Sequence, residues 1–257
     1  MRNKGFTLIE LLVVIAIVAI LLGILVPGLS MAKDVTRRMT CRNHLKQIGL
    51  TMKIYAEEYK GKLPLNQDGW WAWDVAFATT DLVIENGGDK RTFYCPSDKS
   101  KGPERPEVWQ FSLIYGAPRP FYMVTEPTDI ARRRQEFRVT GYFWLMDMEN
   151  SNRPFQIQGV PARKWTRDFN DLRNAGSTEL ITDATLSSTP DPATATFVEV
   201  QGGSFSWHQT YDRTNHVNKK SQPIGGNICY ADGHADWRRW EDMQLRTPSN
   251  WLPSHWW

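Results

Sequence analysis

One apolar segment near the amino end limits what this chain can fold into. From Phe6 to Val26 every residue is apolar except Thr7, Gly23 and Glu10. A helix rises about 1.5 Å per residue, so a run of this length matches the ~30 Å hydrocarbon core of a bilayer. We therefore predict a transmembrane helix over residues 6–28. A carboxylate inside it costs roughly 2.5–3.5 kcal/mol on insertion scales, so Glu10 needs a partner or a purpose.

The residues before this segment complete a motif. Two basic residues lie in the first five, and the chain continues as Gly-Phe-Thr-Leu-Ile-Glu from Gly5. This order resembles the amino terminus of the type IV pilin and type II secretion pseudopilin family. The resemblance implies that a prepilin peptidase cuts after Gly5, removes the leader 1–5 and methylates Phe6. It also implies a helix bend at Pro27.

The same resemblance gives Glu10 a role in assembly. An isolated carboxylate in lipid favours its protonated form, whereas the free amino group of Phe6 on a neighbouring subunit supplies an opposite charge. Such a pair would set the register between subunits. In the alternative interpretation, Glu10 lies at the membrane interface and reaches water.

An ordinary secretory signal is the competing interpretation of this region. Ser30-Met31-Ala32 offers a small-x-small cleavage site after an apolar core. The apolar run is longer than the usual ~7–15 residues of a signal core, and it contains Glu10 near its start. A retained anchor is therefore preferred.

After the anchor, residues 29–60 predict an amphipathic second half of one long helix. The apolar residues recur at spacings of three and four, which is the helical period: Leu45, Ile48, Met52, Tyr55 and Tyr59. Gly61 and Pro64 would end the helix. The segment from Cys41 to Leu50 resembles large pseudopilin-like proteins of planctomycete and verrucomicrobial lineages.

Residues 61–257 are predicted to form a periplasmic or extracellular globular domain. A second helix is expected from about Gly69 to Glu85, although strand alternation fits part of that range too. A strand over Thr92–Cys95 would be closed by a turn at Pro96–Asp98. Further strands are expected at Trp109–Tyr115, Phe137–Met146 and Thr178–Asp183.

The clearest local prediction is a hairpin near the carboxyl end. Asp232-Gly233 separates two strand-like runs and suits a two-residue type I′ turn. This register would place Ile228 opposite Trp237 and Tyr230 opposite Ala235. The fold class that follows is α+β and pilin-like: a long amino-terminal helix packed on an antiparallel sheet that includes this hairpin.

Several polar residues in the last quarter are metal or acid-base candidates. They are His208, His216, Asp232, His234 and Asp236, with Asp183 on another strand. Their spacing is none of the tight zinc patterns, so a structural role is preferred, and no cofactor is assigned. Calcium at a carboxylate-lined loop is the remaining option, partly because some major pseudopilins bind calcium near this end. His216 and the later Ala231-Asp232-Gly233-His234 resemble a carboxyl-terminal motif of the same pseudopilin-like proteins, a His followed by Ala-Asp-Gly-His. Here His216 is 16 positions before Asp232, which is longer than in that motif.

Three cysteines allow at most one intramolecular bridge. In an exported chain Cys41 and Cys95 are the favoured pair, because both lie in motif-like surroundings while Cys229 follows a strand pattern. The alternative is three reduced, partly buried thiols.

Composition excludes some functions and leaves others open. The formal charge is only +3, part of it in the leader, so nucleic acid is not an expected partner. Twelve tryptophans suggest carbohydrate stacking, but core and subunit packing is preferred. Trp256 and Trp257 at the chain end are expected to be exposed unless the tail docks.

The resemblance implies a structural protein and not an enzyme. It would be held in the inner membrane with its amino end cytoplasmic and would join other pilin-like subunits in a pseudopilus or pilus-like fibre. Its further partners would be membrane lipid and the platform for type II secretion or related export. The alternative is a membrane-tethered periplasmic or surface binding module, for example one that binds glycans. A hydrolase that uses the His/Asp group is a third hypothesis.

Overall fold

The computed structural model describes most of the chain. The described residues are 8–64, 72–98, 100–102, 104, 109, 111–112, 136–146, 168–205, 208–247 and 253–257. The leader and the predicted cleavage site at Gly5 and Phe6 lie outside these ranges. So does the proposed start of the second helix near Gly69.

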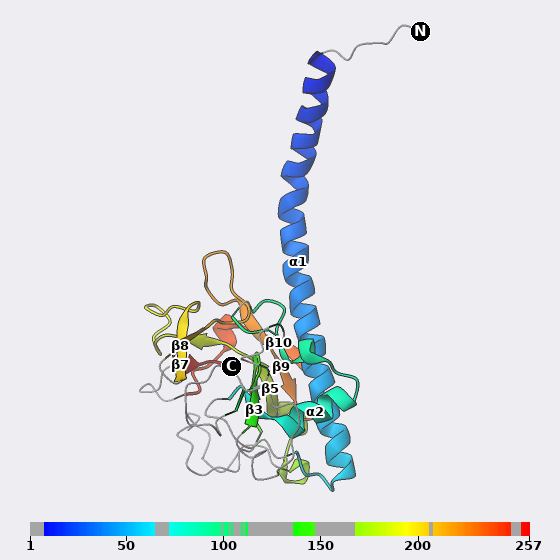
Figure 1. The fold of residues 1–257 in the computed structure, drawn as a ribbon, viewed down its shortest axis with the longest axis vertical. Coiled ribbons are helices and arrows are strands. Elements are labelled where there is room, and N and C mark those ends of the chain that lie inside the picture. The colour runs from blue at the N-terminus through cyan, green and yellow to red at the C-terminus, as the bar shows by residue number, and fades with distance from the viewer. Residues whose placement is uncertain are drawn as a thin grey trace. The chain divides into compact units, whose positions relative to one another are not determined.

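The first element is a helix, α1, from Leu8 to Glu58 (Figure 1). It continues through Pro27, and a bend at that residue stays a prediction. The chain divides within this helix into a unit that ends at Arg37 and a second unit that begins at Arg38.

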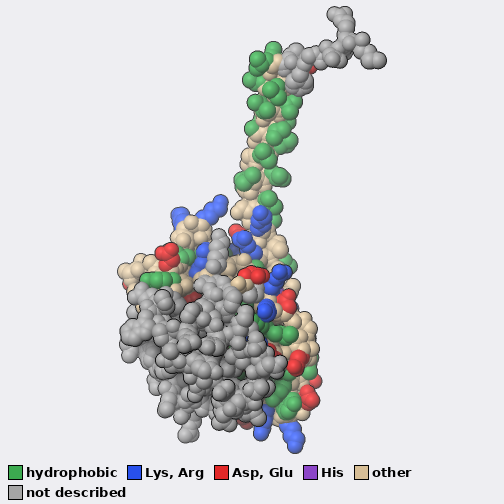
Figure 2. Space-filling view, in the orientation of Figure 1, with side chains coloured by type: hydrophobic (Ala, Val, Ile, Leu, Met, Phe, Trp, Pro, Cys, Tyr) green, Lys and Arg blue, Asp and Glu red, His purple; other side chains and the backbone are tan. Residues whose placement is uncertain are grey.

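In the first unit the apolar side chains of α1 are solvent-exposed, and Figure 2 shows them in green along this part of the helix. Leu8, Ile24 and Leu25 are examples, each well over half exposed. Among the helices of the described residues, α1 is the one that is long and apolar enough to cross a membrane. Its length and composition fit the predicted anchor.

In the second unit α1 packs on a four-stranded antiparallel sheet. The strand order is β10 (Ala235–Arg239), β9 (Gly225–Tyr230), β5 (Glu179–Asp183) and β4 (Tyr142–Trp144). The helix contributes Leu45, Ile48 and Met52, all fully buried, to one cluster with Leu180, Ile181 and Cys229 of the sheet. The predicted α+β fold, with a long helix on a sheet that includes the carboxyl-terminal hairpin, is confirmed.

The buried stripe of α1 ends earlier than its periodicity suggests. Ala56 is buried, whereas Tyr59 is exposed and stacks on Tyr55 with ring centroids 4.1 Å apart. The chain leaves the helix at once, since Lys60 and Gly61 both adopt positive φ. The two tyrosines therefore cover the helix end instead of the sheet.

Gly49 allows the closest approach between α1 and the sheet. A Cβ at this position would overlap Cys229 Sγ of β9. We expect Gly49→Ala to destabilise the domain by about 1–3 kcal/mol, although alanine favours a helix, because an overpacked contact must push the helix away. Urea unfolding checks this. Gly49→Ala combined with Cys229→Ala should recover most of the loss, and equal losses in the single and double variants would refute the contact as the cause.

The remaining elements form smaller layers around the sheet. They are β1 (Asp74–Ala76), α2 (Phe77–Glu85), η1 (Lys90–Phe93), β2 (Phe111–Ser112), β3 (Glu136–Val139), η2 (Phe169–Asp171), η3 (Ala175–Ser177), β6 (Leu186–Ser187), β7 (Val200–Phe205), β8 (His208–Asp212), η4 (Trp240–Asp242) and β11 (Ser254–His255). Strands β1, β3 and β2 form a three-stranded antiparallel sheet in that order. Strands β7 and β8 pair, as do β6 and β11.

Three local predictions are corrected. The second helix begins only at Phe77, after strand β1. The range thus contains a strand followed by a helix, in agreement with both the alternating and the helical pattern of its apolar residues. Thr92 does not start a strand: Asp89 accepts hydrogen bonds from the Arg91 and Thr92 amides, and this capping box makes the segment a 3₁₀ helix. The expected strand over residues 137–146 is two strands in different sheets, β3 and β4. The turn after Cys95 is present, with Asp98 N–H donating to Cys95 O.

The carboxyl-terminal hairpin forms, but its register differs from the prediction by one residue. Ala235 lies opposite Cys229, and Trp237 lies opposite Asn227. The loop has three residues, because Gly233 N–H donates to Tyr230 O and only Gly233 has positive φ. This is a type I turn followed by a left-handed glycine, so Asp232 avoids the strain that a type I′ turn would impose.

The chain end docks on the domain, which corrects the expected exposure of its tryptophans. Strand β11 pairs with β6, and Trp256 and Trp257 are 8% and 2% exposed. Trp257 joins a second cluster with Phe143 and Trp73. The described tryptophans are mostly buried in this way, which favours core packing over carbohydrate stacking.

His255, which packs against this second cluster, should make stability depend on pH. It is buried against the rings of Trp73 and Phe143, and burial, assisted by the charge of Lys101, lowers the pKa of His255 from 6.5 to about 3. Lys101 itself pairs with Asp212 at 2.8 Å. Between these two pH values the unfolded chain binds a proton that the folded chain does not, so stability falls as the pH decreases through this window.

We expect His255→Leu to remove this part of the acid sensitivity. Relative to the variant, the wild type should lose about 2–3 kcal/mol between pH 7 and pH 4.5. Urea unfolding at several pH values measures the difference. Parallel pH profiles for the two proteins would contradict the assignment.

Candidate functional site

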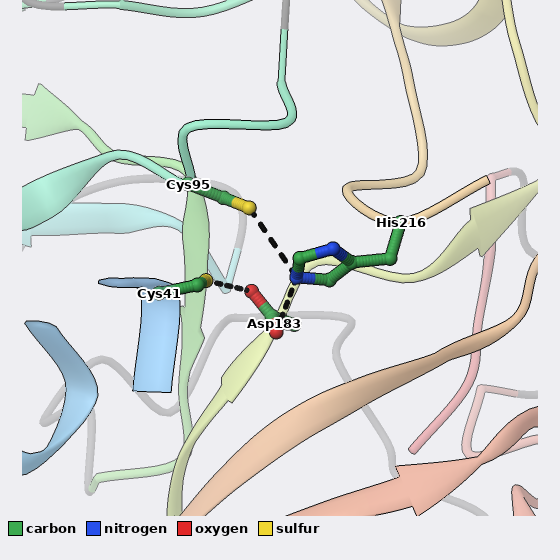
Figure 3. Close-up of side chains that lie close together, drawn as sticks. All are labelled: Cys41, Cys95, Asp183 and His216. Carbon is green, nitrogen blue, oxygen red and sulfur yellow. Dashed lines mark hydrogen bonds and ion pairs between the residues drawn. The ribbon is translucent and has the colours of Figure 1, made fainter. Parts of the chain in front are cut away.

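Four side chains from distant parts of the chain converge in the core of the domain (Figure 3). Cys41 lies on α1, Cys95 follows η1, Asp183 ends β5, and His216 lies between β8 and β9. All four are buried, and their potential ligand atoms lie within 4.8 Å of one another. We call them the core cluster.

Three side-chain contacts connect the four residues of the core cluster in one series. Cys41 Sγ donates to Asp183 Oδ1 at 2.8 Å. His216 Nε2 lies 3.1 Å from Asp183 Oδ2 and 3.4 Å from Cys95 Sγ. One imidazole nitrogen thus faces both a carboxylate and a sulfur, as Figure 3 shows.

Asp183 is the most heavily hydrogen-bonded member. Oδ1 accepts a bond from Asn215 Nδ2 at 2.9 Å. Oδ2 accepts bonds from the backbone and side-chain nitrogens of Asn227 at 2.7 and 2.9 Å. Burial alone would raise the pKa of Asp183, but the charge of His216 and the hydrogen bonds from His216, Cys41 and the Asn227 backbone lower it to about 2. The carboxylate is therefore ionised although it has no solvent contact.

The other members share this charge arrangement. Burial would lower the pKa of His216, but the facing Cys95 and Asp183 raise it to about 10. Burial would raise the pKa of Cys95, but the contacts with Cys41 and His216 lower it to about 7. Burial raises the pKa of Cys41, and Cys95 and Asp183 add to that effect. Of the two thiols, Cys95 is thus the more easily ionised.

Neighbouring groups fix the orientation of the cluster. The ring of Trp237 meets the His216 ring edge-on, with centroids 5.1 Å apart. Ser97 N–H donates to Cys95 Sγ at 3.4 Å. The hydroxyl of Tyr142 lies 3.4 Å from Cys41 Sγ. The cluster members are consequently held in place before any ligand arrives.

This geometry is unsuited to nucleophilic catalysis. In a Cys-His-Asp triad the two ring nitrogens of the histidine serve different partners, one for the nucleophile and one for the carboxylate. Here the same nitrogen, His216 Nε2, contacts both Cys95 and Asp183. The side chains of Cys95 and His216 are also buried, at 2% and 3% exposed.

The structure separates the sequence candidates into two groups. His216 and Asp183 belong to the core cluster, whereas Asp232, His234 and Asp236 lie on the hairpin with side chains about half exposed. His234 contacts Asp232 at 2.5 Å and Asp236 at 3.6 Å. A calcium site at these carboxylates stays a prediction. The side chain of His208 is not among those that the structure describes.

Sequence reasoning favoured a bridge between Cys41 and Cys95, with three reduced thiols as the alternative, and it did not include the cysteines among the metal candidates. The structure has Cys41, Cys95 and Cys229 as free thiols, and the predicted bridge is not formed in it. Cys41 and Cys95 are nevertheless brought together, and Cys229 lies apart in strand β9. The signal that could have joined the four residues was the motif-like surroundings of Cys41, Cys95 and His216.

The assembly-related candidates belong to the other unit. Glu10 lies in the first turn of α1 and is exposed. The fold, a long amino-terminal helix on an antiparallel sheet, places the chain among α+β proteins of pilin-like architecture.

Comparison with known proteins agrees with that class. Residues 1–26 match the prokaryotic N-terminal methylation motif, and residues 30–81 match a family described as a protein of unknown function (DUF1559). The first match carries the prepilin-type processing signal, which implies cleavage by a prepilin peptidase and is consistent with membrane anchoring.

Two relatives extend the similarity. Competence protein ComGC of Bacillus subtilis (strain 168) is 27% identical over 93 residues, which are 35% of this chain and 95% of its own length. The ComG operon protein 3 homolog of Bacillus licheniformis is 33% identical over 64 residues, 25% of this chain and 66% of its own. No solved structure matches the chain. Most of the globular domain therefore has no counterpart in these relatives.

Proposed function

We propose that this chain is a structural subunit of a pseudopilus or pilus-like fibre. The observation that carries the proposal is the prepilin-type motif over residues 1–26, which includes most of the exposed apolar half of α1. A short pilin-like relative such as ComGC matches over nearly its whole length, which supports the same assignment.

In this proposal a prepilin peptidase cuts between Gly5 and Phe6, and residues 6–28 hold the subunit in the inner membrane. The domain then lies on the periplasmic side. Subunits associate through their apolar helices, because helices of this kind pack against one another in lipid by close contact and by pairing of polar groups. The fibre would serve type II secretion or a related export machine, and no enzymatic step is assigned.

Intact-mass measurement and amino-terminal sequencing of the protein from native membranes test the processing step. We expect a chain that starts at Phe6 and carries one added methyl group. The same measurement in cells that lack the peptidase should give the uncut chain. A start at Lys33 would mean cleavage after Ala32 as an ordinary secretory signal, and the proposal would fall.

A further inference from the structure

The core cluster has no part in the proposed assembly, yet it has the composition of a ligand site. It combines two sulfurs, one imidazole nitrogen and one carboxylate, all of them buried. Proteins use these donors to bind zinc in a tetrahedral arrangement. Sulfur and imidazole ligands are poor ones for calcium or magnesium, which prefer oxygen.

We propose that Cys41, Cys95, Asp183 and His216 bind one zinc ion, which fastens α1 to the sheet and to the two loops that carry Cys95 and His216. With Zn–S near 2.3 Å and Zn–N or Zn–O near 2.0 Å, the edges of a zinc tetrahedron are about 3.3–3.8 Å. The contacts of His216 Nε2, at 3.1 and 3.4 Å, are close to these edges. All donor atoms lie within 4.8 Å of one another, so small side-chain shifts suffice.

The surrounding hydrogen bonds fit a metal site. Zinc ligands are usually oriented by a second layer of donors and acceptors. The three hydrogen bonds that Asn215 and Asn227 donate to Asp183 do not involve the other cluster members, so they remain when the carboxylate binds an ion. Ser97 N–H on Cys95 Sγ would likewise remain on a zinc-bound thiolate. The contacts that the ion would replace are those between the ligands themselves.

Charge gives a second reason. Asp183 is a carboxyl group with no solvent exposure, and its ion pair among the described residues is with His216, which is charged only when it is protonated. A buried anion needs a compensating charge. A divalent ion supplies it, allows both sulfurs to be thiolates and leaves the imidazole neutral.

The zinc content of the full-length protein decides the proposal. The protein is purified in detergent from cells grown with added zinc and analysed for metals and intact mass. We expect one zinc per chain and a mass that retains both thiols. After removal of the zinc, cobalt(II) should bind in its place and give the visible bands of tetrahedral cobalt together with thiolate-to-cobalt charge transfer.

Variants show whether the named residues hold the ion. Cys95→Ser and His216→Asn should each weaken zinc binding at least tenfold, and Cys95→Ser should also reduce the charge-transfer band. Cys229→Ala is the matched control, because it removes a buried thiol outside the cluster and should keep one zinc per chain.

Two results would overturn the site, and neither depends on the variants folding. One is a wild-type chain that holds no zinc and gives no tetrahedral cobalt spectrum. The other is a metal-free chain that is two hydrogens lighter, which would mean that Cys41 and Cys95 form a disulfide instead. The test does not involve fibre assembly, so its outcome is separate from that of the proposed function.

Discussion

Asp183→Ala is expected to destabilise the domain by about 3–5 kcal/mol, because removal of one partner from a buried charged network leaves the others unpaired. Its carboxylate accepts from Asn215, Asn227 and Cys41 and pairs with His216, all in the core. Domains are commonly stable by only about 5–15 kcal/mol, so the variant should be marginally folded. Urea unfolding followed by tryptophan fluorescence measures the loss.

Two further substitutions test whether the loss of stability comes from the buried hydrogen-bond network around Asp183. Asp183→Asn keeps the shape but turns an acceptor into a donor that faces the amides of Asn215 and Asn227, so it should also cost several kcal/mol. Asp236→Asn is the control, since that exposed carboxylate pairs with Arg42 at 2.7 Å and should change stability by about 1 kcal/mol or less. Similar small effects at Asp183 and Asp236 would show that the buried network does not hold the domain together.

Glu10→Ala is expected to abolish fibre assembly while cleavage and membrane insertion stay normal. The substitution removes a carboxylate from an apolar helix, which lowers the cost of insertion by roughly 2.5–3.5 kcal/mol. If the helix serves only as a membrane anchor, the variant should therefore insert as well as the wild type or better, and fibre assembly should be normal. A pairing role with the Phe6 amino group of a neighbour predicts a chain that inserts and then fails to associate.

The charge and the shape of Glu10 can be tested apart. Glu10→Gln keeps the size and removes the charge, so charge pairing predicts the same defect as Glu10→Ala. Glu57→Ala, an exposed acidic position on the same helix, is the control and should assemble. Sheared fibre yield is compared with the amount of processed protein in the membrane fraction. Wild-type yields for both Glu10 variants would remove the assembly role.

The sequence predicted the structure best where apolar residues recur with the period of a helix or a strand. Leu45, Ile48 and Met52 predicted a helix face, and the structure buries that face on the sheet. The hairpin was predicted from Asp232 and Gly233, but its register was wrong. Two- and three-residue loops use the same residues, and the choice depends on whether Asp232 adopts positive φ.

The core cluster could be predicted only in part. His216 and Asp183 were candidates, but nothing local connects them with Cys41 and Cys95. Cys41 and Asp183 are 142 positions apart, and Cys95 and His216 are 121 apart. Contacts of this kind depend on strand order and helix placement, which periodicity and spacing do not determine.

The packing of α1 has a consequence for the order in which the domain folds. Arg42 on the helix donates to Ala235 O on the last strand of the sheet, 193 positions later. At 5–20 residues per second, roughly 10–40 s of synthesis separate these two residues. The element made first thus completes its packing last, and closure of so long a loop is slow. During that interval part of the apolar face of the helix is open to wrong contacts.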